Sequence, residues 1–167
     1  LPVEDLFKYD PSTKRVIDFL SNAYEGYTSE FNSKLIRSTS EQLFEQYCEK
    51  NDSVDWVYKN GDTGQQYFSI IYLDAYNKQW LFYPDYIIKK KNGEVWIVET
   101  KGGETGGLNK NVDIQIENKF NAFKEYAKNK KIKWGFVRYL DNSLYIDNTE
   151  FIMDMSDSHW IPLANEF

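Results

Sequence analysis

The stretch Phe82 to Gly103, FYPDYIIKKKNGEVWIVETKGG, decides the fold of this chain. Two of its runs, 83–88 and 95–98, are rich in β-branched and aromatic residues. A short Lys-Asn-Gly break separates these runs, and this pattern predicts a β-hairpin. The run 95–98 is apolar on both faces, which favours a place inside a sheet rather than at its edge.

Three charged residues interrupt the hairpin: Asp85, Glu99 and Lys101. Side chains alternate along a strand, so Glu99 and Lys101 point to the same face. A two-residue turn would place Asp85 opposite Thr100, on the wrong side. A three-residue loop with Gly93 in the left-handed conformation places Asp85 opposite Glu99 instead. We predict this second register, which gathers two carboxylates and an ammonium group.

Two carboxylates on neighbouring strands form a site for a hard divalent cation. Mg²⁺ binds through one or two carboxylates and keeps several waters. Such an ion lowers the pKa of a bound water, and an adjacent lysine can orient that water or offset charge on a phosphate. The alternative is that Glu99 and Lys101 form an ordinary pair at a strand end and that Asp85 only begins a strand after Pro84. Burial of charge beside an apolar strand is costly without a partner, which favours the metal site.

The same residues resemble the PD-(D/E)xK nuclease superfamily: Pro84-Asp85 matches its PD element and Glu99-Thr100-Lys101 its E-x-K element. The flanking YPDYIIKK and IVETKGG are similar to the C-terminal endonuclease domain of type III restriction enzyme Res subunits. The resemblance covers about residues 38–128. It implies a Mg²⁺-dependent DNA endonuclease, with Mn²⁺ as a further possible ion. Asp85 and Glu99 would bind the metal, the Thr100 carbonyl would add a ligand, and Lys101 would position or activate the attacking water.

The resemblance also implies double-stranded DNA as substrate, an upstream helicase domain in the parent chain and a modification subunit. The chain begins at Leu1 rather than methionine, so we expect it to be part of a longer protein. Two other functions stay open. One is a non-catalytic interaction module that retains the nuclease fold, and the other is a repair or junction-resolving nuclease that uses the same residues on branched DNA.

Composition excludes several other classes. The single cysteine, Cys48, excludes an internal disulfide and suits a reducing cytoplasm. One histidine, His159, argues against a His-centred triad or zinc site. No apolar run is long enough to cross a bilayer, so no membrane partner is expected. The net charge of -6 resides in residues 141–167, whereas residues 108–134 are basic and leave a face available to phosphates.

A helix is predicted from Ser38, because Ser38-x-x-Glu41 has the form of a capping box. In the resembled family a helix with the pattern Glu-x-x-Phe places its glutamate beside the metal, and Glu41 with Phe44 matches that pattern. The cap and the catalytic role compete for the Glu41 side chain, and Glu45 is the reserve candidate. Residues 1–37 are expected to form a helical arm ahead of a nuclease-like domain over 38–167.

The expected fold is α/β: a restriction-endonuclease-like core with a central mixed sheet of four or more strands, an antiparallel meander, and helices on both faces. The meander is predicted from the strands within 54–81. A helix over 112–129 would permit a parallel crossover to a strand at 132–140. On that helix Lys119 and Gln115 are candidate DNA contacts. Two further interpretations concern Arg138, expected at the surface, and the glycine-rich 102–107, expected to be a flap or a plain linker.

Overall fold

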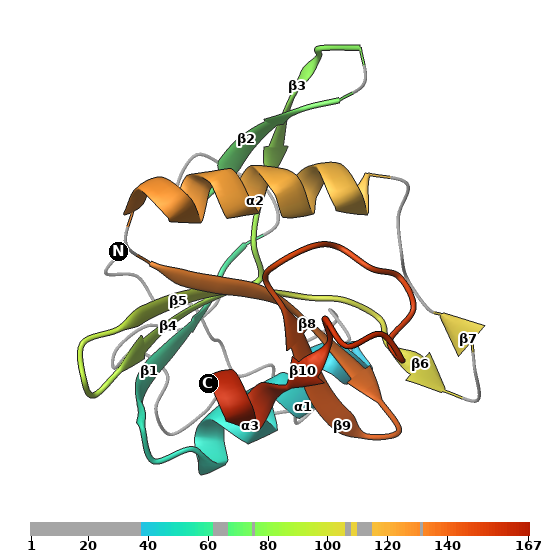
Figure 1. Cartoon of the computed structure of the whole chain (residues 1–167). Coiled ribbons are helices and arrows are strands. Elements are labelled where there is room, and N and C mark those ends of the chain that lie inside the picture. The colour runs from blue at the N-terminus through green and yellow to red at the C-terminus, as the bar shows by residue number, and fades with distance from the viewer. Residues whose placement is uncertain (1–37, 62–66, 75, 106–107, 110–114, 131) are drawn as a thin grey trace, which may run out of the picture.

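The computed structural model describes residues 38–61, 67–74, 76–105, 108–109, 115–130 and 132–167. These residues form an α/β fold in which helices pack with a mixed β-sheet (Figure 1). The elements, in chain order, are α1 (Thr39–Lys50), β1 (Val54–Lys59), β2 (Ile70–Leu73), β3 (Gln79–Phe82), β4 (Tyr86–Lys90), β5 (Val95–Thr100), β6 (Glu104–Thr105), β7 (Leu108–Asn109), α2 (Ile116–Lys130), β8 (Lys133–Leu140), β9 (Ser143–Asp147), β10 (Ile161–Pro162) and α3 (Leu163–Glu166). The arm predicted over 1–37 lies outside the described residues.

The predicted hairpin, β4–β5, lies inside the main sheet. Within the described residues the strand order is β1-β4-β5-β8-β6-β7, with β9 paired to β8 and β10 paired to β9. The strands β1, β4 and β5 are antiparallel neighbours, whereas β8 runs parallel to β5. The expected mixed sheet of four or more strands is therefore confirmed.

The register predicted for the central hairpin is also confirmed. Tyr86 lies opposite Val98, and continuing the ladder by one residue places Asp85 opposite Glu99. The turn ends at Gly93, which has φ +91°, a conformation that costs glycine little and other residues more. The three-residue loop thus sets the pairing that the charged residues require.

A parallel strand follows the long helix, as the sequence predicts. The helix α2 forms the crossover between β5 and β8, a connection that parallel neighbours need. The chain then returns antiparallel into β9 through Asp141 and Asn142, which have φ of 46° and 65°. Two successive residues with positive φ form the type of tight turn that matches the twist of a hairpin.

The antiparallel meander predicted within 54–81 is wrong in its order. The strands β2 and β3 pair with each other in a separate two-stranded sheet, and β1 pairs directly with β4. Asn60 accounts for this order, because its side-chain amide donates to the carbonyls of Phe68 at 2.7 Å and Pro84 at 2.9 Å. These bonds hold together the two ends of the segment that contains β2 and β3. The chain then returns to the main sheet as β4, which pairs with β1.

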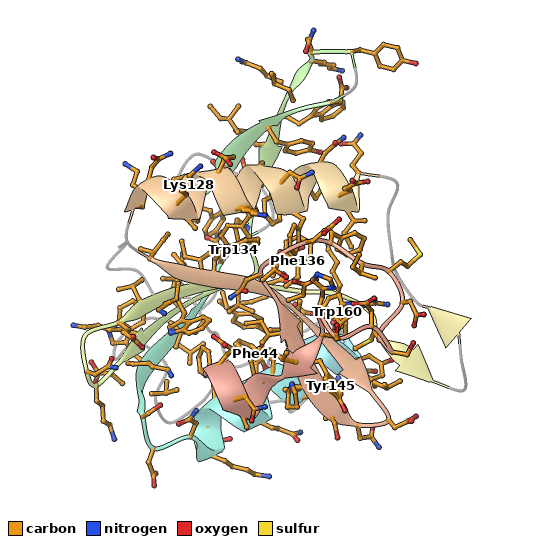
Figure 2. All side chains as sticks on the ribbon, in the orientation of Figure 1. Phe44, Lys128, Trp134, Phe136, Tyr145 and Trp160 are labelled. Atoms are coloured by element: carbon orange, nitrogen blue, oxygen red, sulfur yellow. The ribbon has the colours of Figure 1, made fainter. Side chains whose placement is uncertain are left out.

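Two clusters of buried apolar side chains hold these elements together. One includes Phe44 of α1 and Trp96 of β5. The other includes Ile97 of β5 and several side chains of α2 and β8, among which Trp134 and Phe136 lie between that helix and the sheet (Figure 2). Neighbouring residues of β5 therefore serve different clusters, as the alternation of side chains along a strand requires.

Arg138 corrects an expectation, since its side chain is fully buried in β8 rather than at the surface. Its Nε donates to the Gly102 carbonyl at 2.8 Å and its terminal nitrogen to the Met153 carbonyl at 2.7 Å. The guanidinium group also lies over the Trp160 ring. Carbonyl oxygens and an aromatic face thus replace the water lost on burial, and Arg138 ties the segment after β5 to the C-terminal region.

The glycine-rich segment 102–107 forms part of the sheet where the structure describes it. The short strand β6 lies parallel to β8, and Gly103 is buried. A Cβ atom at Gly103 would overlap the Tyr139 carbonyl, so this close approach of two backbones requires glycine. Residues 106–107 lie outside the described residues, and the alternatives of flap and linker stay open for them.

Candidate active site

Asp85 precedes β4 and its carboxylate accepts three hydrogen bonds. Oδ1 accepts from Lys59 Nζ at 2.7 Å, while Oδ2 accepts from the Thr100 backbone N–H at 2.8 Å and from its hydroxyl at 2.6 Å. Burial raises the pKa of the Asp85 carboxyl, but the Lys59 ammonium and these hydrogen bonds outweigh burial and hold the pKa below its ordinary value. Asp85 is therefore ionised and fixed in orientation.

Glu99 lies opposite Asp85 and is held by different groups. Its Oε1 lies 2.6 Å from Lys101 Nζ, and its Oε2 accepts from the Asp85 backbone N–H at 3.2 Å. Burial, followed by the nearby charge of Asp85, raises the pKa of Glu99 to about 7, although Lys101 acts in the opposite direction. The two carboxyl groups are thus close enough to influence each other's ionisation.

Lys101 follows β5 directly, and its backbone N–H donates to the Val137 carbonyl of β8 at 2.9 Å. This bond fixes the chain beyond the strand end, so the alternation of side chains continues to Lys101. The prediction that Glu99 and Lys101 share one face is confirmed by their ion pair. Both side chains are largely buried, with exposures of 15% for Lys101 and 6% for Glu99.

Lys59, the last residue of β1, belongs to the site and was missed by the sequence analysis. Its Nζ lies 2.7 Å from Asp85 Oδ1 and 3.0 Å from Glu41 Oε1. Burial lowers the pKa of the Lys59 ammonium group. Asp85 and Glu41 together raise this pKa by more than burial lowers it, so it lies above its ordinary value. The signal that could have found Lys59 is the pairing of β1 with β4, which places it opposite Tyr86, the neighbour of Asp85.

Glu41 forms the predicted helix cap and also contacts the candidate site, while its catalytic role stays a prediction. Its Oε2 accepts from the Ser38 backbone N–H at 2.8 Å, which completes the predicted capping box of α1. Its Oε1 forms the ion pair with Lys59. The first turn of α1 thus brings Glu41 to the charged residues of the site. These five residues, Glu41, Lys59, Asp85, Glu99 and Lys101, are called the cluster below. The reserve candidate Glu45 accepts from the Tyr86 hydroxyl at 2.5 Å.

The two predicted DNA contacts lie at the start of α2. Gln115 accepts a hydrogen bond from the Tyr72 hydroxyl of β2. Lys119 is half-buried, and its backbone N–H donates to the Gln115 carbonyl at 3.0 Å. The structure therefore connects Gln115 to the β2–β3 hairpin, and contact of either residue with DNA stays a prediction.

The oxygen atoms of Asp85 and Glu99 fit a hard divalent cation. Among the described residues, no group of three or more His, Cys, Asp or Glu side chains is arranged to hold a metal ion. Mg²⁺ needs no such group, because one or two carboxylates suffice when several waters complete its shell. The donor set therefore suits Mg²⁺ or Mn²⁺ held by these two carboxylates and water.

Comparison of the chain with protein-family models, curated proteins and solved structures finds no significant match. In the part of the chain that the structure describes, no helix has both the length and the apolar character needed to cross a membrane. Function is therefore inferred from the chemistry of the site.

Proposed function

We propose that this chain is a Mg²⁺-dependent endodeoxyribonuclease domain of the PD-(D/E)xK type, related to the nuclease part of type III restriction enzymes. The observation that carries the proposal is the meeting of Asp85, Glu99 and Lys101 at adjacent strand ends. The substrate is double-stranded DNA. The proposal includes an upstream helicase domain, a modification subunit and a cytoplasmic location, where such an enzyme meets its DNA.

The arrangement of helices supports a restriction-endonuclease-like core. In Figure 1, α2 is drawn above the main sheet and α1 with α3 below it. Side chains of α2 belong to one apolar cluster, and side chains of α1 and α3 belong to the other. This division supports helices on both faces, with the candidate site where β4 begins and β5 ends.

The residues of the cluster divide the chemistry of hydrolysis among them. Asp85 and Glu99, with the Thr100 carbonyl, would hold Mg²⁺, which lowers the pKa of a water and offsets charge on the scissile phosphate when bound. The Lys101 ammonium can donate to the attacking water or to a phosphate oxygen, and it stabilises the charge that develops there. Water attack forms one phosphorus–oxygen bond as the bond to the leaving sugar oxygen breaks.

Cleavage of supercoiled plasmid DNA tests this proposal. We expect nicking with Mg²⁺ and none with EDTA, and Lys101→Ala should lower the rate by about 100-fold or more, because a preorganised donor at developing charge is lost. The matched control is Lys91→Ala, an exposed lysine in the turn of the same hairpin, which should retain activity. Full activity of Lys101→Ala would contradict the role given to this residue.

A second candidate function is a non-catalytic interaction module, and the β2–β3 hairpin favours it. The outer face of this hairpin exposes Ile71, Leu73 and Leu81, and its turn exposes Tyr76. Trp80, which pairs with Tyr72 on the other face, is exposed as well. Contiguous exposed apolar side chains mark sites of protein association. The module predicts no DNA cleavage at any Mg²⁺ or Mn²⁺ concentration, in the intact parent protein as well, whereas the nuclease predicts cleavage that survives substitution of Ile71 and Leu81 by lysine.

A further inference from the structure

Lys59 occupies the space between two carboxylates of the candidate site. Its ammonium group contacts Glu41 Oε1 at 3.0 Å and Asp85 Oδ1 at 2.7 Å. The side chain is only 3% exposed, and Nζ lies 4.8 Å from the centre of the Tyr86 ring. Packing against this ring holds the ammonium group in a position with little access to water.

This lysine separates the carboxylates of the cluster into two sets. Glu41 contacts Lys59 and the start of α1, whereas Glu99 contacts Lys101 and the Asp85 backbone. Asp85 joins the sets, with Oδ1 on Lys59 and Oδ2 on Thr100. In the described part of the chain, the acidic side chains form no single group of three metal ligands. A cation held by Asp85 and Glu99 would therefore not be shared with Glu41 while Lys59 remains in place.

The charges of the cluster also limit how many cations it can bind. Three carboxylates and two ammonium groups carry one net negative charge when all are ionised. One divalent cation would make the cluster positive by one charge. A second divalent cation beside the buried Lys59 ammonium would add strong repulsion between like charges at short range.

We propose that the Lys59 ammonium replaces a second metal ion, so that the site binds one divalent cation, at Asp85 and Glu99. This inference rests on the proposed function and adds the number of metal ions to it. Lys59 is a positioning residue in this account. It neutralises Glu41 and orients Asp85 without contact to the substrate.

The number of bound Mn²⁺ ions tests the inference without an activity measurement. Calorimetric titration of metal-free protein, with electron paramagnetic resonance to count bound Mn²⁺, should give one ion per wild-type chain. Lys59→Met keeps most of the length of the side chain but leaves Glu41 and Asp85 without a cation, so two ions per chain are expected. Lys59→Arg should restore one ion, and Lys101→Met, which removes the other lysine, should also bind one.

Each outcome separates the two proposals. Two ions per wild-type chain would overturn the role of Lys59 and leave a metal-dependent nuclease standing. One ion in folded Lys59→Met, as in wild type, would overturn it in the same way. No Mn²⁺ binding to wild type would reject the metal-dependent nuclease itself. If Lys59→Met does not fold, Lys59→Gln, whose amide can donate to both carboxylates, takes its place, and the wild-type count is independent of either variant.

Discussion

The two carboxyl groups of the central hairpin have opposite pKa shifts because their neighbours differ. Both are buried, which raises the pKa of each. Asp85 receives the Lys59 ammonium and both donors of Thr100, and these favour its ionised form. Glu99 has Lys101 as its ion-pair partner but also lies near the negative charge of Asp85. The site therefore holds one carboxylate that stays ionised and one that titrates near neutral pH.

Glu99→Gln should become more stable relative to wild type as pH rises. The folded-state pKa of Glu99, about 7, exceeds the value of about 4.3 in an unfolded chain. The folded state thus binds the proton more tightly, and the stability that this group contributes below the unfolded pKa is lost as pH rises through about 7. Between pH 5 and pH 8, we expect the free energy of unfolding of Glu99→Gln to rise by ~2 kcal/mol relative to wild type.

Urea unfolding in EDTA measures this difference without bound metal. Glu49→Gln, an exposed change on α1, is the control and should follow the pH dependence of wild type. A difference between Glu99→Gln and wild type that stays constant over this pH range would contradict the pKa given to Glu99.

At the scale of elements, local rules predict the hairpin and the start of α1, but not the neighbours of β1. The hairpin register depends on alternation and on Gly93, and the helix start depends on Ser38 and Glu41, all within a few residues. The pairing of β1 depends on Asn60, whose amide reaches carbonyls 8 and 24 residues away. No local periodicity encodes such contacts, so the sequence analysis missed Lys59. The residues that it did predict are neighbours in the hairpin or match the helix pattern.

Two glycines of the hairpin region should differ in their tolerance of alanine. At Gly93 an added Cβ meets no atom within 4 Å, so Gly93→Ala has only the conformational cost of φ +91°, about 1 kcal/mol. At Gly103 an added Cβ would overlap the Tyr139 carbonyl, and backbone must move, at about 2 kcal/mol or more. Urea unfolding of both variants measures the order, and a costlier Gly93→Ala would refute the packing described at Gly103.

At the scale of the whole molecule, the two faces of the β2–β3 hairpin have different surroundings. Its inner face contributes Ile70, Tyr72 and Phe82 to the core beneath α2. Its outer face leaves Ile71 and Leu81, which pair across the hairpin, exposed by 62% and 54%. Because side chains alternate along each strand, one face of this hairpin packs in the core and the other face is exposed.

Neighbouring isoleucines of β2 should thus respond differently to truncation. Ile70→Ala removes buried methyl groups and should cost about 2 to 5 kcal/mol of unfolding free energy. Ile71→Ala changes an exposed side chain and should stay within about 0.5 kcal/mol of wild type. Thermal or urea unfolding compares the two variants. Equal losses would mean that the outer face is covered by another part of the protein.

The two oxygens of Glu41 make position 41 sensitive in two separate ways. One oxygen begins α1 and the other contacts Lys59. Removal of the Glu41 carboxylate therefore loses the helix cap and the ion pair with Lys59 together, whereas Ser38→Ala loses hydrogen bonds at the helix start alone. A loss of stability in a position-41 variant thus combines the loss of both contacts, and comparison with Ser38→Ala separates them.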